Sequence, residues 1–230
     1  MVKQTERIFI CGASGQGKSY FLLWLVEERY VFKRNRRFVF IDYTGEYINL
    51  GKIPGVYIIY VTPQNFGKID WQKTIEKYRK IVVESEGLHL NQFNREIIKI
   101  GYACMKTGNV QFIMDEAYNF IPIISPFTTR GQLAEQRRVM TYIASQGRKY
   151  GVGYCVATQR IAMVDKTPLT QANELFIFKM HAQQDLDSIS PYIPNPDEIK
   201  KLPKFYCIHY TIDGKLEKIK AGKTSVKHLG

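Results

Sequence analysis

The chain has 230 residues, of which 45% are hydrophobic and 13% aromatic, and its formal net charge is +12. This length and composition predict one globular α/β domain with a substantial core and exclude a disordered chain. The longest apolar runs, 21–26 and 56–61, are far shorter than the roughly 20 residues that cross a bilayer, so we expect no membrane segment.

The N-terminal stretch RIFICGASGQGKSYFLLWLV contains an apolar strand, a glycine-rich turn and an apolar helical pattern. It has the form G-x-x-x-x-G-K-[ST] in the setting that a phosphate-binding loop (P-loop) requires. Glycines let backbone N–H groups curl around a phosphate, and the helix N-terminus adds partial positive charge. Lys18 would reach the β- and γ-phosphates of ATP, and the Ser19 hydroxyl would bind Mg²⁺. The residues expected to bind the nucleotide are Gly12, Ala13, Ser14, Gly15, Gln16, Gly17, Lys18, Ser19 and Tyr20.

Strand and helix patterns alternate along the rest of the chain. We expect helices at 18–30, 71–84, 91–105, 132–148 and 184–189, with Asp70 as an N-cap. We expect strands at 37–42, 56–61, 110–114, 151–157 and 174–180, then a hairpin of 205–212 and 215–219 around Asp213-Gly214. This alternation predicts a mainly parallel sheet with helices on both faces.

Two of these strands end in polar residues that suit phosphate chemistry. The strand at 110–114 leads into Asp115 and Glu116, so Asp115 would join the Mg²⁺ shell and Glu116 would polarise the water that attacks the γ-phosphate. Without the phosphate loop, two solvated acids at a strand end would be the simpler explanation. The strand at 151–157 leads to Gln159, which would contact the γ-phosphate and the water if its strand lies between the other two. A polar strand end without a role explains Gln159 about as well.

Several segments together resemble the HerA–FtsK family of DNA-translocating P-loop ATPases. In chain order they are GASGQGKS, FVFIDYTGEY, FIMDEAYNF, GRKYGVGYCVATQR, QANELFIFKMHAQQDLDSI and a closing LPK…DGK hairpin. The resemblance implies a RecA-like (ASCE) fold, with a sheet of order 5-1-4-3-2. It also implies a ring, commonly hexameric, with ATP bound between subunits.

The same resemblance implies that Arg148, in GRKYG, is the finger that a neighbouring subunit inserts toward the γ-phosphate. A structural role for Arg148, neutralising the dipole of its helix end, stays open. Arg137 and Arg138, roughly three turns earlier, compete for the finger role.

Larger members of the family carry additional segments that we do not identify in this sequence. We identify no N-terminal β-barrel, no membrane segment and no winged helix, so the chain resembles the minimal genome-packaging ATPases of viruses. We therefore expect residues 1–230 to form a single motor domain that translocates double-stranded DNA. Its partner would be a capsid or portal protein, and it would act in the host cytoplasm or in the virion. The alternatives are a HerA-like helicase or translocase of a cell or plasmid, a P-loop kinase, and an assembly protein in which ATP only orders subunit contacts.

The charge and the scattered cysteines bear on partner and environment. The pI near 9.5 favours an acidic partner, with nucleic acid first. Candidate DNA-contacting groups are Lys33 to Arg37, Lys200, Lys201, Lys204, Lys215, Lys218 and Lys220. For each cluster alone, a solvated surface is the simpler explanation. Four separated cysteines favour a reducing compartment, although a hyperthermophilic source would permit disulfides. The histidines have no ligand spacing, so no metal beyond Mg²⁺ is expected.

Overall fold

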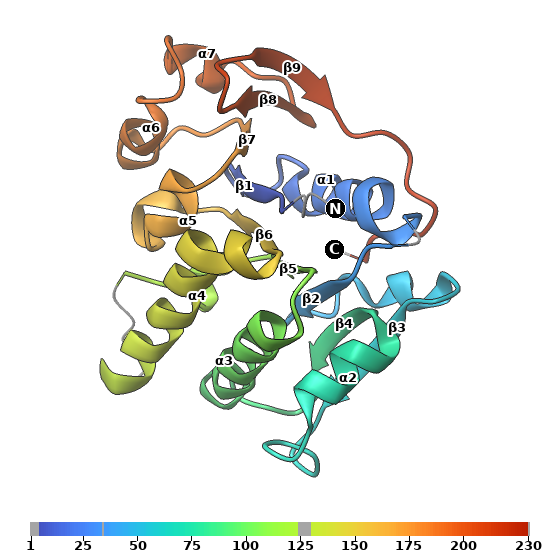
Figure 1. Cartoon of the computed structure of the whole chain (residues 1–230). Helices are drawn as coiled ribbons and strands as arrows, with labels where there is room; N and C mark the ends of the chain where they lie inside the picture. Colours follow the sequence, from blue (N-terminus) through green and yellow to red (C-terminus); the bar gives the residue numbers. More distant parts are fainter. Residues whose placement is uncertain (1–4, 34, 124–129, 230) are drawn as a thin grey trace.

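The computed structural model describes residues 5–33, 35–123 and 130–229, and its centre is one twisted sheet (Figure 1). The strands are β1 Arg7–Cys11, β2 Phe38–Asp42, β3 Tyr57–Val61, β4 Lys80–Ser85, β5 Val110–Met114, β6 Val152–Thr158, β7 Glu174–Phe178, β8 Tyr206–Thr211 and β9 Leu216–Lys220. Their order across the sheet is β3-β4-β2-β5-β6-β1-β7-β8-β9. All pairs among β1 to β7 are parallel, whereas β8 and β9 form an antiparallel hairpin at one edge.

The sheet confirms the expected α/β fold class and its strand order. The predicted 5-1-4-3-2 is present as β7-β1-β6-β5-β2. Two additional strands, β4 and β3, extend the sheet beyond β2, and the C-terminal hairpin extends it beyond β7. The phosphate-loop strand β1 is therefore central, with β6 as one neighbour and β7 as the other.

Helices cover both faces of the sheet. They are α1 Lys18–Val26, α2 Trp71–Tyr78, α3 Leu90–Thr107, α4 Arg130–Tyr150, α5 Thr167–Thr170, α6 Gln183–Ile189 and α7 Asp197–Lys200, with short turns η1 Glu27–Val31, η2 Ile48–Lys52, η3 Ala117–Asn119 and η4 Ile161–Met163. In Figure 1, α1 lies on one face, and α2, α3 and α4 lie on the other. Successive strand residues point to opposite faces, so the apolar side chains of β1 divide between two cores. Phe9 packs into the core under α3 and α4, and Ile8 and Ile10 pack against α1.

The expected helix at 71–84 is wrong in its second half. Its N-cap prediction is confirmed, because the Asp70 carboxylate accepts a hydrogen bond from the Lys73 N–H at 3.1 Å. However, α2 ends at Tyr78, and Arg79 then takes a left-handed conformation with φ 62°. The chain continues as β4, in which Ile81, Val82 and Val83 are fully buried between β2 and β3. Its run of β-branched residues fits a buried parallel strand better than a helix end.

The expected helix at 18–30 also changes character along its length. It is α-helical through Val26 and continues as the single π-helical turn η1.

The segment after β9 lies against α1 instead of rejoining the sheet. In Figure 1 it runs from the hairpin past α1 toward β2. The Tyr20 hydroxyl donates a hydrogen bond to the Gly222 carbonyl at 3.1 Å, and the buried Glu27 carboxylate accepts one from the Ser225 N–H at 2.7 Å. We call residues 221–229 the C-terminal tail.

All four cysteines are buried and none forms a disulfide, and burial raises the pKa of each thiol. In the described part of the chain, no helix is both long enough and apolar enough to cross a membrane.

Candidate nucleotide-binding site

Three adjacent parallel strands end at the same edge of the sheet. The strand β6 lies between β1 and β5, and its register pairs Thr158 with Cys11 and Val156 with Met114. The residues that follow these strands are the phosphate loop, the carboxylate pair and Gln159. The carboxyl ends of parallel strands are where open α/β sheets bind ligands.

The phosphate loop fits its place only with glycine at two positions. Gly12 has φ 147°, and a Cβ atom there would lie 2.5 Å from Cβ of Phe178. Gly17 has φ 96°, and a Cβ atom there would lie 2.5 Å from Cδ1 of Phe205. L side chains rarely adopt these φ values, and both sites lack the space for one. The loop is therefore held tightly between β7 and the turn before β8.

Lys18 is buried beneath this loop. Its ammonium group donates a hydrogen bond to the Ala13 carbonyl at 2.9 Å, so the side chain folds back along the loop. Burial lowers the pKa of Lys18, and the nearby carboxylates of Asp115 and Glu116 act in the opposite direction. Among the described residues, the Ala13 carbonyl is the one hydrogen-bond partner of this buried cation, so the ammonium is well placed to bind an anionic ligand.

The two carboxylates after β5 have different surroundings. Asp115 is buried and accepts hydrogen bonds from the Tyr47 hydroxyl and, at 2.8 Å, from the Glu116 N–H. Glu116 is half-buried, with a left-handed backbone at φ 49°, and its carboxylate accepts a hydrogen bond from the Gln159 amide. Burial raises the pKa of Glu116, while the Gln159 hydrogen bond and Lys18 oppose that rise. A half-buried carboxylate with a raised pKa suits a general base.

The loop after β2 contributes residues whose roles the sequence did not indicate. The Asp42 carboxylate accepts hydrogen bonds from the Gly45 N–H at 3.0 Å and the Tyr47 N–H at 2.8 Å, which fold this loop back. Burial raises the pKa of Asp42 to about 6, although these backbone hydrogen bonds lower it. The fold of the loop directs Tyr47 to Asp115 and places Glu46 in the pocket described next. The sequence feature that could have indicated these residues is the polar run Gly45-Glu46-Tyr47, which follows shortly after the end of a strand.

The phosphate loop, the ends of β5 and β6 and the loop after β2 border a cavity of about 470 Å³ that opens to solvent. Its lining residues are Ser14, Gly15, Gly17, Lys18, Ser19, Tyr20, Glu46, Glu116, Gln159, Lys204, Phe205 and His228. The structure thus brings Lys18, Glu116 and Gln159 together. Of the other predicted residues, Gly12, Ala13 and Gln16 form the loop without lining this cavity.

Four of the lining residues were not predicted as site residues. Phe205 belongs to the turn before β8, where its N–H donates to the Gln16 carbonyl at 3.1 Å. Lys204 precedes it, although the sequence suggested Lys204 as a DNA contact. His228 comes from the C-terminal tail, with Nε2 3.4 Å from the Glu46 carboxylate. No local pattern signals these contacts, because they join residues far apart in the chain.

The donor groups beside the loop fit Mg²⁺. The Tyr47 hydroxyl contacts the Asp115 carboxylate and lies 3.4 Å from the Ser19 backbone carbonyl, so one side chain touches both expected ligand residues. One carboxylate and one hydroxyl match the way Mg²⁺ binds, with nucleotide phosphates and water completing its shell. Across the described residues, no cluster of three or more His, Cys, Asp or Glu side chains would hold a metal alone. The residues thus fit a nucleotide-bound ion.

The structure separates Arg148 from its own cavity. Arg148 is exposed in the last turn of α4, next to the start of β6, whereas Gln159 follows the end of that strand. A strand of 7 residues spans roughly 20 Å. Arg137 is committed elsewhere, because its guanidinium donates to the Pro122 carbonyl at 2.9 and 3.1 Å. Arg138 is exposed on the outer side of α4.

Comparison with known protein families identifies the family to which this chain belongs. A family model described as "Helicase HerA, central domain" matches residues 4–183. The chain belongs to this family. This HerA-type domain is a P-loop ATPase with the mixed α/β fold predicted from its sequence. A comparison with curated protein sequences finds no match.

Solved structures share the fold of this HerA-type domain. The genome packaging NTPase B204 from Sulfolobus turreted icosahedral virus 2, in complex with AMP, matches with TM-score 0.65 at 18% identity, over 95% of this chain and 98% of that one. VirB4 of Thermoanaerobacter pseudethanolicus matches with TM-score 0.69 at 10% identity, over 97% and 91% of the two chains. The pCW3 conjugation coupling protein TcpA, in its monomer form with ATPγS, matches with TM-score 0.56 at 15% identity, over 96% and 61%. At these identities the likeness establishes the fold.

Proposed function

We propose that this chain is a motor that hydrolyses ATP to translocate double-stranded DNA, with residues 1–230 acting as a single motor domain. The observation that carries the proposal is the convergence of Lys18, Glu116 and Gln159 on one cavity at the carboxyl edge of the sheet. Lys18 begins α1 after the phosphate loop, Glu116 follows β5 and Gln159 follows β6. Together they provide a cation for phosphate, a base and an amide that holds the base.

The chemistry follows from what each side chain contacts. Lys18 binds the terminal phosphates of ATP, and the N–H groups of the loop hold the remaining phosphate oxygens. Ser19 and Asp115 would hold Mg²⁺, which when bound would neutralise charge on the phosphates. Glu116 accepts a proton from the attacking water, because its carboxylate is half-buried and faces the cavity. Gln159 fixes the Glu116 carboxylate through its amide hydrogen bond.

The position of Arg148 supports a ring. Arg148 is at the far end of β6 from its own cavity, so it would act as a finger only in the site of a neighbouring subunit. Such a cation raises the hydrolysis rate by about 10³–10⁵ in systems where it acts. We propose a homo-oligomeric ring, with a hexamer favoured, in which ATP lies between subunits.

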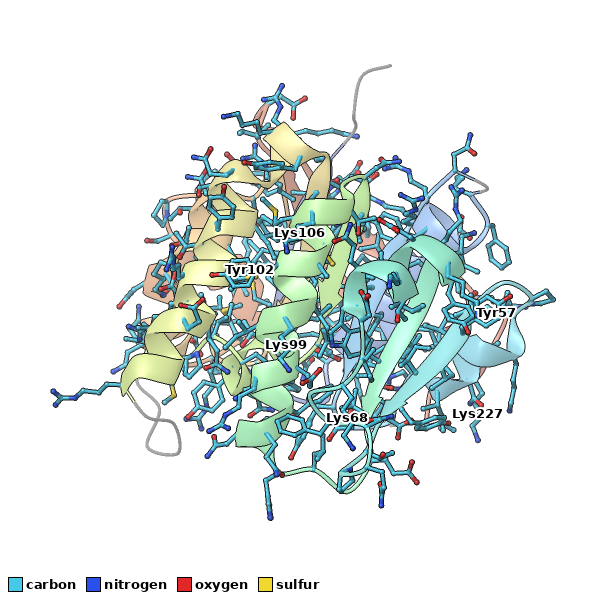
Figure 2. The ribbon with its side chains drawn as sticks, turned by 60° about the horizontal axis from the view of Figure 1, so that its bottom comes forward. Tyr57, Lys68, Lys99, Tyr102, Lys106 and Lys227 are labelled. Atoms are coloured by element: carbon cyan, nitrogen blue, oxygen red, sulfur yellow. The ribbon has the colours of Figure 1, made fainter. Side chains whose placement is uncertain are left out.

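Exposed lysines provide a surface that would bind a polyanion such as DNA whatever the base sequence of that DNA. Figure 2 shows Lys99 and Lys106 on α3 with Lys68 below them, and all three side chains are exposed. Of the predicted contacts, Lys218 and Lys220 lie over the Tyr206 ring at 5.0 and 5.6 Å, and both remain exposed. Non-specific phosphate contacts suit a motor that must move along any DNA sequence. Among the other predicted positions, Arg34 lies outside the described residues.

We further propose that this motor packages a viral genome. Support comes from the likeness to B204, which spans nearly all of both chains and whose described activity is genome packaging. A capsid or portal protein would then be the partner, and the host cytoplasm or the virion the location. The likeness to TcpA, a conjugation coupling protein, supports a second candidate, a DNA translocase of a cell or plasmid.

ATPase activity measured with and without duplex DNA, together with the mass of the assembled particle, tests the motor proposal. We expect a ring and faster hydrolysis with duplex DNA, and Lys18→Ala as control should hydrolyse no ATP. If the protein is a monomer, hydrolyses ATP at the same rate with and without DNA, and transfers phosphate to a small acceptor, it is a kinase instead. Nucleotide binding without hydrolysis under every condition would indicate an assembly protein.

A further inference from the structure

The C-terminal tail has no regular secondary structure, so its position depends on the side chains that hold it. The buried Glu27 carboxylate accepts hydrogen bonds from two consecutive tail N–H groups, that of Ser225 at 2.7 Å and that of Val226 at 3.3 Å. A buried carboxylate without hydrogen-bond donors is strongly unfavourable, and these two N–H groups supply them. Glu27 therefore ties the tail to the end of α1.

The tail then crosses to the loop after β2. The Asn49 side-chain amide donates a hydrogen bond to the Lys227 carbonyl at 2.7 Å, and the Leu229 N–H donates to the Glu46 carbonyl at 3.3 Å. Asn49 is itself buried, in the turn η2. The residue between these two anchored positions is His228, so its backbone is held on both sides.

The His228 side chain lines the cavity at the phosphate loop and is only 9% exposed. Its ring packs edge to face against the Tyr47 ring, with 5.1 Å between the ring centres and 78° between the ring planes. Its Nε2 atom lies 3.4 Å from the Glu46 carboxylate. One imidazole thus contacts two consecutive residues of the loop after β2. Because the Tyr47 hydroxyl donates to Asp115, a displaced Tyr47 ring would also disturb that carboxylate.

We propose that His228 is a positioning residue for the nucleotide-bound Mg²⁺: it holds Tyr47 in place, and Tyr47 orients Asp115. The inference rests on the proposed function, because it requires a nucleotide and its metal ion at the phosphate loop. Groups that orient a metal ligand change metal affinity without touching the metal. The contact between His228 and Tyr47 is one of ring packing, so another aromatic ring should serve in its place.

Calorimetric titration of Mg²⁺ into the full chain, saturated with the β,γ-methylene analogue of ATP, tests this role. We expect His228→Ala to weaken Mg²⁺ binding by about 10- to 100-fold, the usual effect of losing a group that orients a metal ligand. Binding of the analogue without Mg²⁺ should not change, because His228 acts through the metal ligand. His228→Phe keeps a ring against Tyr47 and should keep most of the wild-type Mg²⁺ affinity.

Lys227→Ala is the matched control on the same tail. The Lys227 side chain is exposed, and the contact with Asn49 is made by the Lys227 backbone carbonyl, so this variant should bind Mg²⁺ as the wild type does. An equal loss in Lys227→Ala and His228→Ala would overturn the assignment, because the imidazole would then have no particular part in it.

Other results would also overturn the role of His228. One is an unchanged Mg²⁺ affinity in His228→Ala, and another is a loss of analogue binding in that variant that is equally large without Mg²⁺. A third is a His228→Phe variant that binds Mg²⁺ as weakly as His228→Ala. Failure of the proposed function looks different. A wild-type chain that binds the analogue neither with nor without Mg²⁺ has no nucleotide site, and both proposals then fall.

Discussion

The buried hydroxyl of Tyr47 donates a hydrogen bond to the carboxylate of Asp115. The same hydroxyl lies 3.4 Å from the Ser19 carbonyl, and the Tyr47 ring packs against Phe40 and His228. One side chain thus links the loop after β2, the first turn of α1, the end of β5 and the C-terminal tail. Because the Asp115 carboxylate is a proposed Mg²⁺ ligand, Tyr47 is placed to orient it.

Tyr47→Phe should weaken the use of Mg²⁺ while leaving the fold in place. The ring keeps its packing, but one oxygen of Asp115 loses its donor, and losses of such supporting hydrogen bonds typically cost about 10- to 100-fold in metal affinity or activity. The measurement is ATPase rate against Mg²⁺ concentration. Tyr154→Phe is the matched control, since it removes a buried hydroxyl that donates to the Pro168 carbonyl. An equal Mg²⁺ shift in both variants would contradict the prediction.

Glu116→Gln should bind ATP with near-normal affinity and lose hydrolysis. Glutamine keeps the size of the side chain but cannot accept the proton of the attacking water, and general bases contribute about 10²–10⁴ in rate. Single-turnover hydrolysis and nucleotide binding measure the two properties separately. Glu76→Gln, on the exposed side of α2, is the control. Normal turnover in Glu116→Gln would remove Glu116 as the base.

Gln159→Ala should move the acidic limb of the pH–rate profile to higher pH. The Gln159 hydrogen bond lowers the pKa of Glu116, so its loss raises that pKa further. The base must be ionised to act, and activity therefore rises only at a higher pH than in the wild type. Profiles of kcat against pH, recorded for both proteins, show the shift. A profile that falls in height without moving would mean that Gln159 acts on the phosphate alone.

Arg148→Ala should lose activity by itself and regain part of it when mixed with Lys18→Ala subunits. Arg148 lies too far from its own cavity, so each variant would supply what the other lacks at some subunit interfaces. ATPase activity across mixing ratios tests this, with Lys149→Ala as a neighbouring control on the same helix turn. Mixed rings that form without any rescue would assign Arg148 a structural role at the helix end.

Glu174 should make stability depend on pH in the acid range. Burial would raise its pKa, but hydrogen bonds from Arg29, at 2.6 and 2.8 Å, and from His209 lower it to about 2. Because the native state favours the carboxylate, its stabilisation is present above the unfolded pKa of 4.5 and is lost as pH falls toward 2. This difference corresponds to roughly 3 kcal/mol.

Urea unfolding at several pH values, for wild type and Glu174→Gln, measures this contribution. The variant should be less stable at pH 7 and lose less stability on acidification. Glu76→Gln is again the exposed control. If wild type and Glu174→Gln lose stability in parallel as the pH falls, the ion pair contributes nothing to folding.

The sequence by itself determined the central strands and the residues at their ends. The phosphate loop, Asp115-Glu116 and Gln159 each follow an apolar strand, and local patterns of three to eight residues carry that information. Parallel strands bring their carboxyl ends to one edge. The strand order implied by the family resemblance made these strands neighbours, so it predicted the convergence of Lys18, Glu116 and Gln159.

Only the tertiary structure decided the rest of the site. The strand β4 forms where the sequence predicted the second half of a helix, because pairing with β2 and β3 buries its β-branched side chains. Tyr47 reaches Asp115, and Phe205 and His228 reach the cavity, through contacts between segments far apart in the chain. Such contacts depend on how loops and tails pack over a finished sheet, and no local periodicity encodes that packing.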